Sequence, residues 1–188
     1  MIELSARPDM RAHLGTPFVL ELTSAGIAAA ILEHADTYEL LEFTNRCSAF
    51  FELVKGRAPS RDDTAHMIDE RPNTVPRECK LLIGLRRNQK LLGVLDLLHG
   101  YPDSNTWFLG LLVLDPNVRR EGIGSTVYAA IRRWATGYGA RRIQLIVQEQ
   151  NPSAFAFWRA MGFSESEKVI QQLVTGSNQV SLMSDDFK

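Results

Sequence analysis

The chain has 188 residues, 45% of them apolar, and a formal net charge of -1. This length fits one globular domain, and the near-neutral charge gives no broad positive surface, so we expect no nucleic-acid partner. The two cysteines, Cys47 and Cys79, stand far apart in the sequence. Such spacing predicts neither a disulfide framework nor a metal site.

Residues 1–11 mix acidic and basic side chains and lack the long apolar core of a signal peptide. No stretch of the sequence is apolar over a length that crosses a bilayer. We therefore expect a cytoplasmic protein without a membrane partner. It should form a single domain over residues 1–188, in which residues 1–16 are a flexible or added N-terminal segment.

The first elements follow from composition and spacing. Residues 18–23 have the short apolar composition of a strand, and the alanine-rich residues 25–32 resemble a helix interrupted by Gly26. Apolar side chains recur at helical spacing over residues 38–54. Residues 60–63, Ser-Arg-Asp-Asp, then resemble a capping box that opens a short helix.

From residue 80 the pattern becomes that of strands. Residues 81–85 and 91–98, separated by five polar residues, predict a β-hairpin, and residues 107–114 predict a third strand. The remaining predicted elements are a helix after Gly122 that ends near Gly139, a strand at 142–147, a helix at 153–161, and a terminal hairpin of strands 169–174 and 179–183 that turns at 176–178.

Residues 111–125 join an apolar strand, through a turn, to Arg-x-x-Gly-x-Gly and then to a helix. The first N–H groups of a helix lack intrahelical partners, and the helix dipole adds partial positive charge there. Gly122 and Gly124 let the backbone approach a ligand closely, and Arg119 and Arg120 add charge. The segment therefore predicts a cradle for phosphate.

Three other interpretations of the glycine pair compete with this one. A dinucleotide fold is disfavoured because Val127 stands at the third glycine position and because seven residues separate Leu114 from Gly122. A Walker-type loop is disfavoured because no Gly-Lys-Ser/Thr follows the turn. The remaining alternative is that the glycines only cap and pack a helix, which a lone pair would favour.

Two segments carry a resemblance to a known family. Residues 119–124 read Arg-Arg-Glu-Gly-Ile-Gly and match the pattern Gln/Arg-x-x-Gly-x-Gly/Ala. Residues 151–163 read Asn-Pro-Ser-Ala-Phe-Ala-Phe-Trp-Arg-Ala-Met-Gly-Phe and are similar to Asn-x-x-Ala-x-x-Phe-Tyr-x-x-x-Gly-Phe. With these two segments in order, the chain resembles the GNAT superfamily of acyl-CoA-dependent N-acetyltransferases.

The resemblance implies a GNAT-type α/β (α+β) acyltransferase fold, with a mixed, mostly antiparallel sheet of about 6–7 strands and helices on both faces. It also implies a V-shaped notch between the fourth and fifth strands, where the strand with Leu112 and Leu114 splays from the strand with Ile143. The pantetheine arm of acetyl-CoA would pair there like an added strand edge. No metal is implied.

By the same resemblance, the N–H of Leu112 faces the thioester carbonyl as an oxyanion donor, and Leu114 pairs with pantetheine. The side chain of Arg119 braces the phosphate loop. The residues assigned to acetyl-CoA are Leu112, Val113, Leu114, Arg119, Arg120, Gly122, Ile123, Gly124, Ser125, Asn151, Phe157 and Trp158.

Two departures from the family pattern leave the proton-transfer groups open. Trp158 stands where many relatives have a tyrosine that protonates the leaving thiolate, and an indole N–H is not a useful acid. Phe108 stands where some relatives have a glutamate. The leading base candidate is Asp96, because it interrupts an apolar strand and a buried carboxylate needs a partner or a purpose. The other candidates are Tyr101, His99, Asp103 and Glu42.

These observations predict an enzyme that moves an acetyl group from acetyl-CoA to an amine, on a small molecule, by direct transfer in a ternary complex. An acetyl-cysteine route is disfavoured because both cysteines lie outside the matched segments. A non-catalytic acyl-CoA-binding or regulatory module and a protein or peptide N-acetyltransferase are the alternatives. The terminal hairpin is where we would expect a homodimer contact, if one forms.

Overall fold

The computed structural model describes residues 10, 14, 16–173 and 176–187. Its helices are α1 (Thr16–Ser24), α2 (Thr37–Arg46), α3 (Ser48–Lys55), α4 (Arg61–Asp69), α5 (Ile123–Gly137) and α6 (Pro152–Ala160). Its strands are β1 (Ala28–Ile31), β2 (Lys80–Arg87), β3 (Lys90–His99), β4 (Thr106–Leu114), β5 (Arg142–Gln148), β6 (Ser164–Leu173) and β7 (Gly176–Asp186). Short 3-10 turns occur at His34–Asp36, Arg77–Cys79 and Pro116–Val118.

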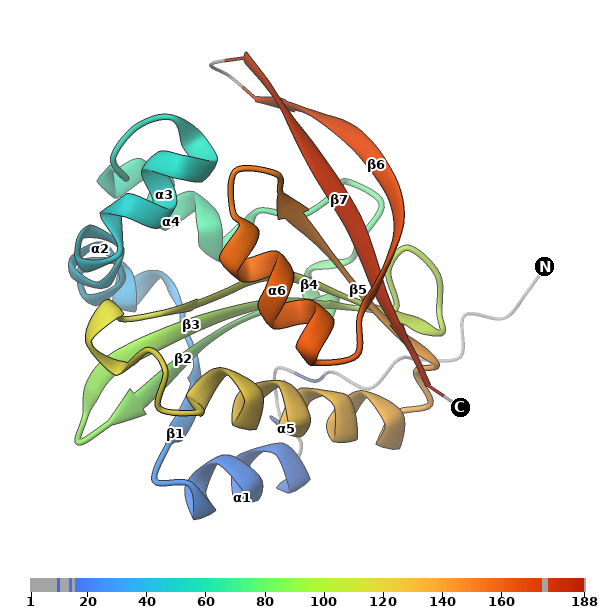
Figure 1. Ribbon diagram of the computed structural model, residues 1–188. Coiled ribbons are helices and arrows are strands. Elements are labelled where there is room, and N and C mark those ends of the chain that lie inside the picture. Colours follow the sequence, from blue (N-terminus) through green and yellow to red (C-terminus); the bar gives the residue numbers. More distant parts are fainter. Residues whose placement is uncertain (1–9, 11–13, 15, 174–175, 188) are drawn as a thin grey trace.

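The strands form one seven-stranded sheet in the order β1-β2-β3-β4-β5-β7-β6 (Figure 1). Neighbouring strands are antiparallel except for β4 and β5, which are parallel. This sheet, with helices around it, is the mixed and mostly antiparallel fold that the family resemblance implies. Among the described residues, no helix has the length and apolar character needed to cross a membrane.

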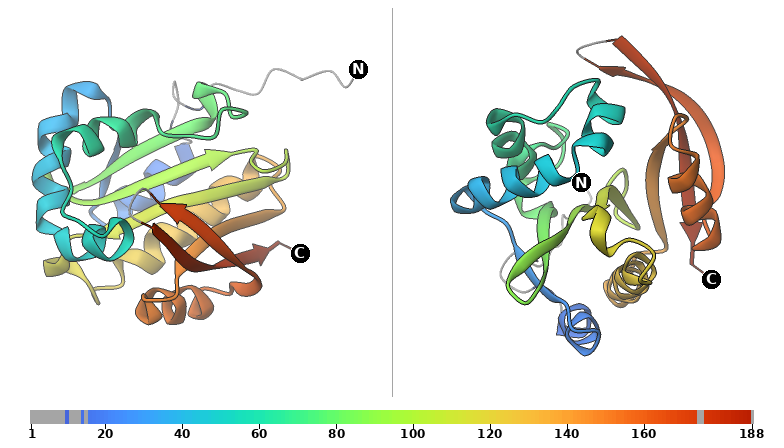
Figure 2. Two further views of the ribbon diagram at one scale, coloured as in Figure 1. Left: turned by 90° about the horizontal axis from the view of Figure 1, so that it is seen from above. Right: turned by 60° about the vertical axis from the view of Figure 1, so that its left-hand side comes forward.

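Helices cover both faces of the sheet (Figure 2). Helices α1 and α5 lie together on one face, and α2, α3 and α4 lie on the other. The larger core fills the space between the sheet and α1 and α5. Its centre is Trp134, which is 1% exposed, stacks on Phe18 at a centroid distance of 4.8 Å and meets Trp107 edge-on at 5.1 Å.

The first two sequence predictions are wrong. Residues 18–23 lie in helix α1 rather than in a strand, and the alanine-rich segment forms strand β1 rather than a helix. Gly26, at φ +73°, ends α1, and the N–H of Ile27 donates to Leu22 O in a Schellman arrangement. The extended chain that follows pairs with β2, so tertiary pairing overrides the helix propensity of alanine.

The later elements follow the predictions more closely. The capping box of Ser60 and Asp63 opens α4 as expected. The first hairpin is tighter than predicted, because Asn88 and Gln89 alone form the turn, at φ +50° and +64°. The predicted turn at 176–178 is wrong, since those residues belong to β7. Residue 174, which was predicted as strand, lies outside the described residues.

The predicted N-terminal segment, residues 1–16, also lies largely outside the described residues. Met10 is described, is 1% exposed and packs in the larger core.

Candidate functional site

A notch opens where β4 and β5 stop pairing. The parallel register runs from Thr106 opposite Arg142 only as far as Leu109 opposite Leu145, although both strands continue. The pairing with β3 shifts at the same place, because β4 has one extra residue, Gly110, between the residues opposite Leu97 and Asp96. A bulge of this kind bends the strand and increases its local twist, which carries β4 away from β5.

The backbone groups of Leu112 and Leu114 point into this notch. The N–H of Asp115 donates to Leu92 O at 2.8 Å, so Asp115 belongs to a hydrogen-bonded pair with β3. Residues of an antiparallel pair alternate in direction. Val113 therefore directs its backbone groups to β3, whereas Leu112 and Leu114 direct theirs toward β5.

The N-terminus of α5 forms a set of unpaired donors beside the notch. Gly122 is the N-cap residue, at φ +80°, and a side chain there would meet open space. The N–H groups of Ile123, Gly124 and Ser125 donate to no acceptor among the described residues, and Arg120 adds a second left-handed residue at φ +69°. Left-handed turns and free N–H groups at a helix start form a concave anion site.

Two arginines and a carboxylate fix the loop that leads to this site. Arg119 Nε donates to Leu114 O at 3.2 Å. The Asp115 side chain is 3% exposed and accepts from Arg46 Nε at 2.8 Å and from Asn117 N at 3.0 Å. Arg46, at the end of α2, also donates to Leu91 O at 2.7 Å. The end of β4 is therefore fastened to both β3 and α2.

Helix α6 closes the other side of the donor set. An added Cβ at Gly124 would lie 3.1 Å from Phe157 Cζ, a tight contact that would require the ring to shift by a few tenths of an ångström. Asn151 is the N-cap of α6, and its Oδ1 accepts from Ala154 N at 3.1 Å. Because that oxygen is occupied in capping, the Asn151 side chain has its amide group left to offer a ligand.

Trp158 is buried in the larger core. Its side chain is 7% exposed and packs edge-on against Tyr128 at 5.6 Å and Phe163 at 5.2 Å. The Tyr128 hydroxyl donates to Asp185 Oδ2 at 2.5 Å, and Arg132 Nε donates to the same oxygen at 2.6 Å. Burial, followed by the bond to this carboxylate, raises the pKa of Tyr128, so the group stays a protonated structural donor.

A carboxylate lies on the opposite face of the sheet at the bulge. Asp96 Oδ2 accepts from Lys80 Nζ at 2.5 Å, while Asp96 Oδ1 is buried and accepts no hydrogen bond from any described residue. Burial raises the pKa of Asp96 to about 6, against the lowering effect of Lys80. The carboxyl group thus titrates near neutrality and has an unused acceptor.

Asp96 lies between two small apolar clusters on that face. One cluster, beneath α2–α4, includes Val94, with Leu111 packed against it; the other includes Leu98, with Tyr101 and Phe108 packed against it. Tyr101 and Phe108 meet edge-on at 5.8 Å. The predicted candidates Asp96 and Tyr101 therefore lie on the same sheet face, next to apolar walls.

The other base candidates have structural roles or are exposed. His99 is 5% exposed, with Nε2 3.1 Å from Glu78 O. Asp103 accepts from Asn105 N and from Thr106 Oγ1 in the turn before β4. Glu42 is exposed on α2.

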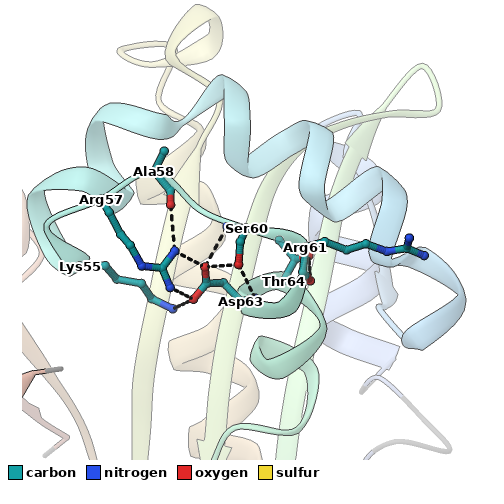
Figure 3. Close-up of polar contacts among 7 residues, drawn as sticks. All are labelled: Lys55, Arg57, Ala58, Ser60, Arg61, Asp63 and Thr64. Carbon is teal, nitrogen blue, oxygen red and sulfur yellow. Dashed lines mark hydrogen bonds and ion pairs between the residues drawn. The ribbon is translucent and has the colours of Figure 1, made fainter. Parts of the chain in front are cut away.

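The loop between α3 and α4 is held on this same face by one carboxylate (Figure 3). Asp63 accepts from both terminal nitrogens of Arg57 at 2.7 and 2.9 Å, and from Ser60 N at 2.8 Å, and Lys55 Nζ lies 3.6 Å away. The bond to Arg57 is the main reason why the pKa of Asp63 is lowered. Asp63 thereby holds the end of α3 and the loop that follows it against the start of α4.

Lys80, Gly110, Arg46 and Asp115 are absent from the residues that the sequence predicts for the site. Lys80 directly precedes one strand of the predicted hairpin and Asp96 interrupts the other, and their opposite charges on paired strands are the signal that could have paired them. The bulge at Gly110 and the clamp of Arg46 on Asp115 depend on the register of β3 and on the position of α2, which the sequence pattern does not specify.

The comparisons with known proteins agree with this geometry. Residues 37–163 match the family model described as Acetyltransferase (GNAT) family. The chain is 34% identical over 76 residues to an aminoglycoside N(6')-acetyltransferase type 1 of Salmonella typhimurium, which covers 40% of this chain and 52% of that protein. It spans about half the length of the curated relatives that it matches.

Solved structures share the fold at low identity. An acetyltransferase from Thermus thermophilus superposes with a TM-score of 0.68 and 22% identity, covering 86% of this chain and 97% of that one. A spermidine N-acetyltransferase from Vibrio cholerae, in complex with CoA and spermine, superposes with a TM-score of 0.63 and 17% identity, covering 86% and 96%. With its sheet, its notch between β4 and β5 and its matched segment 37–163, this chain belongs to the GNAT acetyltransferase family.

Proposed function

We propose that the protein transfers an acetyl group from acetyl-CoA to an amine of a small molecule, by direct transfer. The observation that carries the proposal is the notch, which has free N–H donors at one end and an unpaired carboxylate oxygen on the other face of the sheet. Acetyl-CoA bound along β4 would extend from these N–H donors toward the Asp96 carboxylate.

The residues present fit acetyl-CoA. The pyrophosphate would lie on the N–H groups of Ile123, Gly124 and Ser125, where the helix dipole favours negative charge. The pantetheine arm would pair with the backbone N–H of Leu114, since Leu114 O already accepts from Arg119 Nε. The N–H of Leu112 would donate to the thioester oxygen as negative charge develops on it. Bound in this way, acetyl-CoA supplies the activated acyl group, and the chain supplies orientation and charge stabilisation.

Asp96 is the residue we propose as the base. When the amine nitrogen bonds to the acyl carbon, the nitrogen becomes positively charged and its proton becomes acidic. That proton passes to the Asp96 carboxylate, directly or through one water, as the bond from carbon to sulfur breaks and the thiolate leaves. Because Trp158 is buried in the core, the thiolate takes its proton from water. Its modest proton affinity allows this near neutrality.

The acceptor class is proposed from the named relative and from the surface. The Salmonella relative is named an aminoglycoside N(6')-acetyltransferase. The Asp96 carboxylate, with an apolar wall on each side, would suit an amine carried on a small molecule. Of the acidic residues predicted near α2, Asp36 and Glu39 are occupied by the Glu33 N–H and by Arg86, and Glu42 remains exposed toward solvent.

Thiol release from acetyl-CoA, measured over a panel of aminoglycosides, polyamines and peptides, tests the proposal. We expect turnover with a small-molecule amine and a kcat/KM that falls below about pH 6, because Asp96 must be ionised to accept a proton. The variant Asp96→Asn should lose about 100-fold in kcat/KM together with this acid limb. Tight acetyl-CoA binding without turnover on any amine would favour a non-catalytic binding module instead, and turnover confined to peptides would contradict the acceptor class.

The phosphate assignment has its own test by calorimetry. Gly122→Val should weaken acetyl-CoA binding by about tenfold or more, since a branched side chain disfavours φ +80° and covers the free N–H groups. Gly139→Val is the matched control, because Gly139 has φ +81°, an equally open surround and a place at the far end of α5. Equal binding by both variants would show that phosphate does not lie on this turn.

A further inference from the structure

Lys80 is a basic side chain that lies buried. Its side chain is 1% exposed. It begins β2 on the face that carries Asp96, since Leu82 is opposite Asp96 and Lys80 lies two residues before Leu82 in the strand. A buried ammonium is costly unless it is paired and hydrogen-bonded, so the partners of Lys80 determine where it lies.

Those partners connect the carboxylate to the helical wall. Lys80 Nζ donates to Asp96 Oδ2 at 2.5 Å and to Glu70 O at 2.9 Å. Glu70 is the C-cap of α4, where the helix dipole favours a positive charge. The lysine therefore fixes one oxygen of Asp96 and leaves Oδ1 without a donor among the described residues.

We infer that Lys80 is a positioning residue of the acetyl-transfer site: its ammonium holds Asp96 by Oδ2 and leaves Oδ1 for the proton of the acceptor amine. The inference rests on the proposed function. In the transfer step the amine proton goes to Asp96, and Lys80 acts only through its hydrogen bond to that carboxylate.

The charges around Asp96 support this role. Burial raises the pKa of the carboxyl group, Lys80 lowers it, and the Glu70 side chain adds a smaller rise. These are the two charged side chains of the described residues that act on Asp96. With Lys80 in place the pKa is about 6, so the group is ionised at pH 7. Without Lys80, burial would keep the carboxyl group protonated at pH 7, and a protonated carboxyl group is no base.

The test combines a direct titration with kinetics. In Lys80→Met, a ¹³C NMR titration of the Asp96 carboxyl group should move upward by about 1–3 pH units. The acid limb of kcat/KM should move with it, and the rate at pH 7 should fall by about tenfold or more. Lys168→Met is the matched control, because it removes an ammonium paired with Glu149 on an exposed strand and should shift neither quantity.

The outcomes separate this inference from the proposed function. An unshifted Asp96 titration in Lys80→Met overturns the inference, whatever the enzyme turns over. A shifted titration with an unmoved acid limb overturns the role of Asp96 as base, and the positioning role falls with it. The titration of Asp96 needs no acceptor amine. An absence of turnover on every amine would therefore contradict the proposed function without deciding whether Lys80 holds Asp96.

A second comparison covers the case in which Lys80→Met does not fold. Asp96→Asn and the double variant Lys80→Met/Asp96→Asn contain no uncompensated buried carboxylate. If Lys80 acts only through Asp96, the two should have kcat/KM values within about twofold of each other. A further loss of about tenfold in the double variant would show that Lys80 serves the site in another way and would overturn the inference.

Discussion

A methyl group built onto Gly110 would lie 3.3 Å from the carboxyl carbon of Asp96, and 3.5 and 3.6 Å from its two oxygens. The glycine that forms the bulge of β4 is therefore also the residue that faces the proposed base. A side chain at position 110 would press on the carboxyl group from the β4 side. The residue that forms the bulge thus also leaves the space that the Asp96 carboxylate occupies.

We expect Gly110→Ala to lower kcat/KM by about tenfold, because displacement of a catalytic group by a fraction of an ångström weakens proton transfer. Acetyl-CoA affinity should stay within about twofold, since the cradle at α5 is untouched. Steady-state kinetics and calorimetry measure the two effects. Gly137→Ala is the control, because an added Cβ there meets open space. Equal activity of both variants would remove Gly110 and Asp96 from the reacting centre.

A second prediction concerns the left-handed residue in the phosphate loop. Arg120 has φ +69°, a conformation that costs a residue with a Cβ about 1 kcal/mol. Arg120→Gly should therefore raise the free energy of unfolding by up to about 1 kcal/mol, whereas Arg120→Ala should not, because alanine keeps the strain. Urea denaturation of the three proteins makes the comparison. Equal stability of the glycine and alanine variants would contradict a strained backbone at this position.

The third prediction concerns the departure from the family pattern at Trp158. Because this side chain packs between Tyr128 and Phe163, Trp158→Tyr should not add a general acid. It should leave kcat within about twofold and cost about 1–3 kcal/mol of stability, since the smaller ring leaves space and its hydroxyl needs a buried partner. Thiol-release kinetics and urea denaturation test it. An increase in kcat of about tenfold would place position 158 at the thiolate instead.

The sequence could predict the parts of this molecule that depend on local pattern. The capping box at Ser60, the strands from Lys80 to Leu114 and the turn at Gly122 each follow from neighbouring residues. The N-terminal elements could not be predicted in this way. Alanines 28–30 are good helix formers. They form a strand because they pair with the edge of β2, and the residues near Gly26 give no sign of that pairing.

The site shows the same division. The donors at Gly122 and Gly124 lie within one short segment, so a motif can indicate them. The partners of Asp96 come from the start of β2 and from the end of α4, and their meeting depends on the register of a hairpin and on the packing of a helix. The sequence pattern therefore predicts Asp96 as an anomaly in an apolar strand but leaves Lys80 unassigned.

The fourth prediction follows from the carboxylate that closes the loop between α3 and α4 (Figure 3). The hydrogen bonds from Arg57, followed by those from Ser60, lower the pKa of Asp63 below that of the unfolded chain. As the pH falls through about 4, the unfolded chain binds a proton at this residue before the folded chain does, which favours unfolding. The stabilisation by Asp63 is therefore complete above about pH 4 and is lost at lower pH.

Asp63→Asn should cost about 1–2 kcal/mol at pH 7, where Asp63 is ionised and both caps α4 and holds Arg57. The difference from the wild type should shrink as the pH approaches 3, because the unfolded wild-type chain then gains a proton at Asp63 that the folded chain does not bind, which removes part of the stabilisation. Urea unfolding at pH 3, 4, 5 and 7 measures it. Asp62→Asn, one residue earlier on the exposed side of α4, is the control and should show a small difference at every pH. If the Asp63→Asn difference were the same at pH 3 and pH 7, the stabilisation would come from packing of the side chain, since packing does not depend on its ionisation.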